Sequence, residues 1–133
     1  MRTIKFRGKD NHNTWRYGSL VYGEQIQPAI YFEIRNGLCF DWVYVDKKTV
    51  GQFTGLKDVD GKEIYEGDIL ESSRGIRHKV AYDEQLGGFV VRLMNASSVM
   101  DDPSYFNQDW IDYFSKKVVG NIFEEQDETE IQK

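Results

Sequence analysis

Short apolar segments separated by turn-forming residues are the feature that most constrains the fold of this chain. Residues 4–7 alternate apolar with basic side chains, and a similar alternation returns at residues 15–17. A period of two residues is typical of a β-strand with one buried face. Asn36-Gly37 and Asp60-Gly61 supply the positive φ angles that tight hairpin turns need. The pattern therefore predicts antiparallel strands joined by tight turns.

The same pattern gives the expected order of elements. Strands are predicted at residues 4–7, 15–22, 29–34, 38–45, 50–55, 68–71, 78–82, 89–93 and 117–123. One short helix is predicted at residues 103–114, where Asp102 can cap and Pro103 suits the first helical position. Its apolar face would hold Phe106, Trp110, Tyr113 and Phe114. Residues 110–114 also fit a strand, so both structures stay open for them.

Length and composition bound the number of domains. The chain has 133 residues, of which 40% are hydrophobic and 29% charged, so it is long enough for one domain or two small lobes sharing a boundary. We predict an N-terminal β lobe at residues 1–49, a C-terminal small β-barrel at residues 50–124, and a fraying acidic tail at residues 125–133.

Several classes of protein are disfavoured by what the sequence contains. No apolar run approaches the roughly 20 residues that span a bilayer, and the first five residues do not resemble a signal peptide, so a cytoplasmic protein is expected. A single cysteine, Cys39, excludes an internal disulfide, and two histidines make no zinc-ligand pairs. We expect no catalytic residue, no metal ligand and no cofactor. Cys39 is expected to be a small core residue.

The most specific run of the chain covers residues 50–70. It reads Val-Gly-Gln-Phe-Thr-Gly-Leu-Lys-Asp-Val-Asp-Gly-Lys-Glu-Ile-Tyr-Glu-Gly-Asp-Ile-Leu, and residues 119–124 read Val-Gly-Asn-Ile-Phe-Glu. Together with residues 4–7 and Trp15, these runs resemble the YopX family over nearly the whole chain. The resemblance implies a phage or prophage protein from a family without an established activity, with a C-terminal half similar to a Src-homology-3-like β-barrel. The expected fold is all-β or β-dominated, with the N-terminal lobe packed on that barrel.

Five carboxylates within residues 58–68 invite a metal hypothesis, namely Asp58, Asp60, Glu63, Glu66 and Asp68. An EF-hand loop is excluded, because aligning Gly61 with its glycine would place Leu56 and Gly67 at positions that need carboxylates. Turn chemistry is the favoured interpretation, with Asp58, Asp60 and Glu63 pointing outward. Gly55, Gly61 and Gly67 are then expected in turns, and Ile64 and Ile69 in the core beside Phe53. A magnesium site and a catalytic carboxylate pair are the disfavoured alternatives.

Two further groups are candidates for binding. Arg74, Arg77, His78 and Lys79 form a basic cluster that would suit phosphate or an acidic partner, although a charged strand edge explains it too. Aromatic side chains could stack on single-stranded nucleic acid, but a core role is favoured, because a net charge of −5 opposes approach to phosphates. These aromatic residues are Tyr31, Phe32, Phe40, Trp42 and Tyr44.

The functional hypothesis is therefore a non-enzymatic accessory or binding module of phage origin, with a phage or host protein as its partner. A nucleic-acid-associated protein and a divalent-metal-dependent enzyme are the alternatives. The sequence leaves a homo-oligomer open and predicts no membrane partner.

Overall fold

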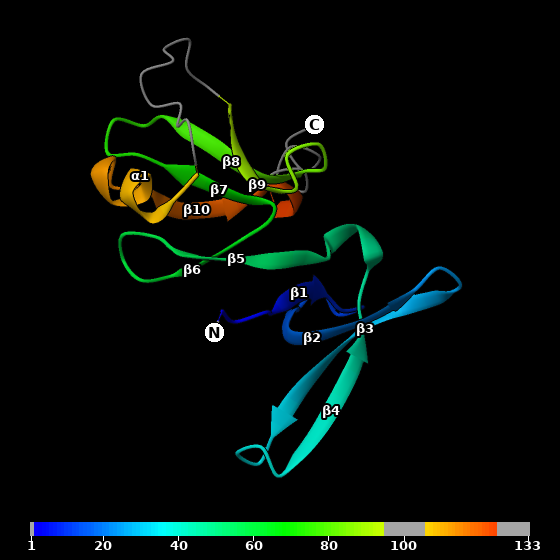
Figure 1. Cartoon of the computed structure of the whole chain (residues 1–133). Helices are drawn as coiled ribbons and strands as arrows, with labels where there is room; N and C mark the ends of the chain where they lie inside the picture. Colours follow the sequence, from blue (N-terminus) through cyan, green and yellow to red (C-terminus); the bar gives the residue numbers. More distant parts are fainter. Residues whose placement is uncertain (1, 95–105, 125–133) are drawn as a thin grey trace. The chain divides into compact units, whose positions relative to one another are not determined.

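The computed structural model describes residues 2–94 and 106–124 and is dominated by antiparallel strands (Figure 1). The chain divides into two compact units, Met1–Phe53 and Thr54–Lys133, and each is described by itself. The predicted boundary lies at residues 49 and 50, whereas the division falls within strand β5 (Gly51–Lys57). The predicted acidic tail, residues 125–133, lies outside the described residues.

The first unit is built from four strands and the start of β5. These are β1 (Phe6–Lys9), β2 (Trp15–Gly23), β3 (Ile26–Ile34) and β4 (Cys39–Tyr44), and a 3-10 helix η1 (Lys47–Thr49) precedes β5. Neighbouring strands are antiparallel in the order β4-β3-β2-β1-β5, so β4 lies at the edge of the sheet.

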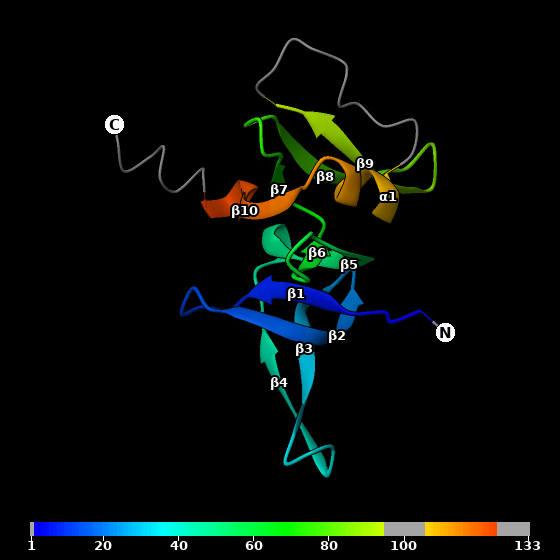
Figure 2. The same cartoon turned by 90° about the vertical axis from the view of Figure 1, so that its left-hand side faces the viewer.

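The β3–β4 hairpin confirms the turn expected at Asn36-Gly37. Arg35, Asn36 and Gly37 have φ angles of 56°, 57° and 84°, and the Leu38 N–H donates to the Arg35 carbonyl at 3.2 Å. Figure 2 shows this hairpin extending away from β1 and β2, with the turn at its free end. Its six consecutive residue pairs, from Ala29–Tyr44 to Ile34–Cys39, keep one register.

Two glycines let the first unit pack closely. A Cβ at Gly8 would lie 2.8 Å from a methyl carbon of Val45, which is 1% exposed. A Cβ at Gly18 would lie 2.1 Å from the carbonyl oxygen of Tyr31 on the neighbouring strand. Both positions therefore need glycine because another part of the chain occupies the space of a side chain.

The second unit contains the end of β5, five further strands, one labelled helix, and a short helical segment at residues 122–124. These are β6 (Glu63–Tyr65), β7 (Asp68–Glu71), β8 (Arg77–Asp83), β9 (Gly88–Leu93), α1 (Gln108–Tyr113) and β10 (Lys117–Asn121). Four strands form an antiparallel sheet in the order β10-β7-β8-β9, and β6 neighbours β5. The β-dominated fold class is confirmed, while a closed Src-homology-3-like barrel stays a prediction.

Helix α1 covers the core of this second unit. Trp110 and Ile111 are buried there, and the Asn107 side chain caps the helix by accepting from the Trp110 N–H at 3.0 Å. The core cluster is completed by Ile64, Leu70 and Val80. The helical alternative is therefore confirmed for residues 108–113, whereas Asp102 and Pro103 lie outside the described residues.

One part of the predicted helix face is wrong. Phe106 and Phe114 do pack against the core, as expected, but Tyr113 is 82% exposed and Ile111 takes the buried position instead. Tyr113 is the last residue of this six-residue helix, where the apolar period is too short to fix which side chains face inward.

One type of hairpin turn occurs three times among residues 2–94 and 106–124. In each turn, the backbone N–H of the first residue donates to the carbonyl of the fifth residue, and the carbonyl of the first residue accepts from the N–H of the fourth. The side-chain oxygen of the first residue also accepts from the backbone N–H of the fifth. The fourth residue has a positive φ, as in a three-residue hairpin loop with a glycine-type bulge. The turns begin at Asp10, Asp58 and Ser72, with positive φ at Asn13, Gly61 and Gly75.

The family-like run at residues 50–70 is mostly as predicted. Gly61 and Gly67 lie in turns with φ of 85° and 93°, and Ile64 and Ile69 are fully buried. Gly55 differs, because it has a φ of 86° within strand β5 rather than in a turn. Among residues 2–94 and 106–124, no helix is long and apolar enough to cross a membrane.

Candidate binding surface

An exposed aromatic face on the β2–β4 sheet is the main candidate functional surface. Phe40, Trp42 and Tyr44 alternate along β4, and their exposed fractions are 66%, 46% and 51%. Tyr31 is directly opposite Trp42 in the register and therefore shares its face. On β2, Tyr17 and Val21 belong to the same face by alternation and are also exposed.

The aromatic rings of this face are ordered by contacts with one another. The rings of Tyr31 and Trp42 stack with centroids 6.1 Å apart and an interplanar angle of 21°. Trp42 meets Tyr44 edge-on, with centroids 4.9 Å apart. Such pairs hold the rings in defined positions, which lowers the entropy lost when a ligand covers them.

The favoured prediction that these aromatic residues fill a core is wrong for four of the five. Only Phe32 turns to the other face, where it is half-buried and lies 5.8 Å from the Arg16 guanidinium carbon. The physical reason is that the side chains on this face of the β3–β4 hairpin have solvent above them, on the interior strand β3 as well as on β4. Cys39, expected in the core, is half-buried on β4.

An open groove of about 1070 Å³ lies beside one end of the aromatic face. Trp42 and Tyr44 belong to both the groove and the face. The groove is lined by Asp10, Asn11, residues 24–28 and residues 42–47. It therefore joins the β1–β2 and β2–β3 turns to the end of β4.

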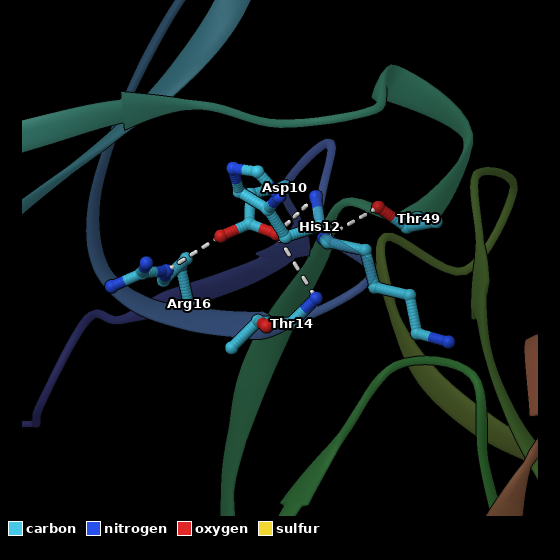
Figure 3. A network of polar contacts seen from close by, with 6 residues as sticks. Asp10, His12, Thr14, Arg16 and Thr49 are labelled. Atoms are coloured by element: carbon cyan, nitrogen blue, oxygen red, sulfur yellow. Dashed lines mark hydrogen bonds and ion pairs between the residues drawn. The ribbon is translucent and has the colours of Figure 1, made fainter.

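Asp10 fixes the β1–β2 turn at this groove (Figure 3). One carboxylate oxygen accepts from the backbone N–H groups of His12 and Thr14, and the other lies 2.9 Å from the Arg16 Nε. The hydrogen bond from Thr14 and the Arg16 guanidinium lower the pKa of Asp10 below its ordinary value. The Asp10 carboxylate therefore accepts the hydrogen bonds that hold the turn.

Charge is divided unevenly between the two units. Met1–Phe53 contains eight Lys or Arg and five Asp or Glu, a net charge of +3. Thr54–Lys133 contains nine against seventeen, a net charge of −8. The net charge of −5 therefore comes entirely from the second unit, and the first unit, which holds the aromatic face, is weakly basic.

The four residues of the predicted basic cluster have different surroundings in the structure. His78 is fully buried, whereas Lys79 and Arg74 are exposed, and the Arg77 Nε lies 2.7 Å from a carboxylate oxygen of Glu71. Strand β8 pairs with both β7 and β9, so the residues do not form a sheet edge. Alternation sends neighbouring side chains to opposite faces. A binding role for these four residues stays a prediction.

The buried His78 belongs to a polar cluster in the core of the second unit. The ammonium of Lys116, which is fully buried, lies 3.2 Å from His78 Nδ1 and donates to the Ile76 carbonyl at 3.1 Å. It also lies 4.9 Å from the centre of the Trp110 ring. An ammonium donates only, so Nδ1 is the acceptor when Lys116 is protonated. Sequence reasoning missed Lys116, because nothing in its local pattern distinguishes it from Lys117.

The carboxylates of residues 58–68 do not act alike. Asp58, expected to point outward, is only 5% exposed, and it accepts from the N–H groups of Asp60, Lys62 and Val118. Asp68 is also buried and accepts from the Tyr65 N–H at 2.8 Å. Among the described residues, no group of three or more His, Cys, Asp or Glu is placed to hold a metal ion. These two buried carboxylates therefore act as acceptors for backbone N–H groups.

Comparisons with known proteins agree with the fold. The family model described as YopX protein matches residues 5–127. A crystal structure of protein EF1440 from Enterococcus faecalis is similar with a TM-score of 0.61 and 23% identity, covering 95% of this chain and 97% of that chain. At that identity the likeness concerns the fold alone. The comparison with curated proteins gives no match.

Proposed function

Because the chain belongs to the YopX family, we propose that it is a non-enzymatic binding module of phage or prophage origin that acts in the cytoplasm of a bacterial host. The observation that carries the proposal is the exposed aromatic face formed by Tyr31, Phe40, Trp42 and Tyr44. Aromatic side chains are enriched at the centres of protein interfaces, where they contribute much of the binding free energy.

The form of the face supports a macromolecular partner. It extends over three strands and is continuous with the groove at Trp42 and Tyr44. Contiguous exposed apolar surface of this kind on a folded domain marks an interaction site more often than an accident of packing. A phage or host protein is the partner that we infer.

Substituting the aromatic side chains tests the proposal. Phe40→Ser, Trp42→Ser and Tyr44→Ser together should abolish co-purification of partners from prophage-induced cells. A control variant with Leu86→Ser and Tyr113→Ser removes two side chains of the second unit that are 76% and 82% exposed. This control should retain the partners. The proposal is wrong if both proteins recover the same partners, provided that circular dichroism shows both folded.

Nucleic acid is the second candidate ligand, favoured by the net charge of +3 of residues 1–53 together with the aromatic face. Bases stack on aromatic side chains largely without regard to sequence, and basic residues contact the phosphates. Fluorescence anisotropy with a labelled single-stranded oligonucleotide distinguishes this candidate from a protein partner. Binding that weakens steeply with added salt and that needs Trp42 would favour it over the protein.

A further inference from the structure

The edge of β4 presents backbone hydrogen-bonding groups of three aromatic residues. The Val45 N–H donates to the Pro28 carbonyl at 3.0 Å, so Pro28 and Val45 occupy a hydrogen-bonded position of the β3–β4 ladder. Such positions alternate with non-hydrogen-bonded ones along an antiparallel pair. Cys39, Asp41 and Val43 therefore direct their backbone groups toward β3. The backbone groups of Phe40, Trp42 and Tyr44 point away from the sheet.

This edge lacks the features that usually prevent strand addition. Along Cys39–Tyr44 the register with β3 is continuous, and the strand contains no lysine and no proline. The edge strand β10, by contrast, carries Lys117 and has a register shift between Val118 and Gly120. Lysines, prolines and bulges protect edges, so β4 is open to a further strand where β10 is protected.

The outward-facing groups fit a second copy of β4 in one antiparallel register. Only the even-numbered residues of β4 can form hydrogen-bonded pairs with a second strand, because the odd-numbered residues already direct their backbone groups toward β3. Centring the pair on Trp42 places Trp42 opposite Trp42 of the second copy, and Phe40 opposite Tyr44. This is the one register that uses all three outward-facing residues. It also sets Asp41, the only charged residue of β4, opposite Val43 rather than opposite another Asp41.

We propose that two copies of this chain associate through their β4 strands, antiparallel and centred on Trp42. The contact is isologous, since the same surface is used on both copies. Paired residues lie on the same side of a sheet, so the two aromatic faces join into one continuous face. The inference rests on the proposed function and deepens it, because the partner-binding face is then built from two copies.

One existing hydrogen bond must be exchanged when the pair forms. In the single chain, an Asp41 carboxylate oxygen accepts from the outward Trp42 N–H at 2.8 Å. In the pair, that N–H donates to the Trp42 carbonyl of the second copy instead. Asp41→Ala removes the competing acceptor and a negative charge, so this variant should dimerise at lower concentration than the native chain.

A charge exchange at the paired positions tests the register. Phe40→Lys with Tyr44→Lys places lysine opposite lysine, whereas Phe40→Lys with Tyr44→Glu places lysine opposite glutamate in the two-fold pair. Sedimentation equilibrium over a concentration series should give twice the 15.6 kDa chain mass for the native protein and for the Lys/Glu variant. The Lys/Lys variant should be monomeric at the same concentrations. Both variants alter the same two exposed side chains, and thermal melts establish that both are folded.

The outcomes separate this inference from the proposed function. A native chain that stays monomeric overturns the pairing, and so does a dimer on which the Lys/Lys and Lys/Glu variants have the same effect. If the native chain is monomeric and the triple serine variant still fails to recover the partners that the native chain recovers, the proposed function stands without the inference. If the charge exchange behaves as expected but the serine variant keeps every partner, the pairing stands and the proposed function falls.

Discussion

Replacing Asp58 should destabilise the protein far more than replacing Asp60, although both belong to the same turn. Asp58 is 5% exposed and accepts three backbone N–H groups, at 2.9 Å from Asp60 and Lys62 and at 3.0 Å from Val118. In Asp58→Asn the amide nitrogen must replace one carboxylate oxygen. Whichever way the amide is oriented, at least one of these N–H groups then faces a donor.

The magnitude follows from the acceptor that is lost. A hydrogen bond to a charged group contributes about 1.5–3 kcal/mol, and an unsatisfied buried N–H adds a cost, so Asp58→Asn should lower the free energy of unfolding by about 2–3 kcal/mol. The matched change Asp60→Asn affects an exposed side chain whose ion pair with Lys117 spans 3.6 Å. It should cost less than about 1 kcal/mol. Urea denaturation at neutral pH measures both, and equal losses in the two variants would refute the assignment of Asp58 as the acceptor that holds the turn.

Three other changes have expected outcomes of different kinds. Because the pKa of Asp10 is lowered in the folded state, its contribution to stability is present above about pH 4 and is lost as the pH falls through the folded pKa. Asp10→Asn should therefore flatten the acid side of a melting-temperature profile. Gly18→Ala should cost about 3 kcal/mol or more, since its Cβ would meet the Tyr31 carbonyl at 2.1 Å, whereas Gly88→Ala, with no atom within 4 Å of the new Cβ, should cost under about 1 kcal/mol. Lys116→Met keeps the buried stem but removes the donor, and chemical denaturation should show a loss of about 1–3 kcal/mol.

The turns were predictable from the sequence because their chemistry is local. Asn36, Gly37 and Gly61 adopt positive φ for reasons contained within four or five residues, whereas Asp60, the first residue of the second pair, does not. The burial of Ile64 and Ile69 followed from the same reasoning, since a turn fixes which residues resume the strand. Gly55 does not follow this rule, because its positive φ occurs within strand β5 and not in a turn.

The aromatic face was not predictable, because alternation shows that a strand has two faces but not which of them is covered. Phe40, Trp42 and Tyr44 have the period expected of a buried stripe. They are exposed because this face of the β2–β4 sheet is open to solvent, which depends on tertiary packing and not on the local pattern. The burial of Asp58 is not predictable from the local sequence for a related reason. Its third donor, Val118, lies sixty residues further along the chain.

The net charge of the chain is a poor guide to what the aromatic face can bind. Exposed charges more than about 8–10 Å apart are largely screened at physiological ionic strength, so the charges beside the face matter more than the total of −5. Those charges are mixed, because Glu33 is paired with Phe40 on the face itself, while Glu24, Asp46 and Lys47 line the adjoining groove. A ligand held mainly by phosphate contacts would therefore meet more acidic than basic groups there. Association through the aromatic rings alone should therefore depend weakly on salt, and a steep salt dependence that does not need Trp42 would show that basic residues away from this face carry the binding.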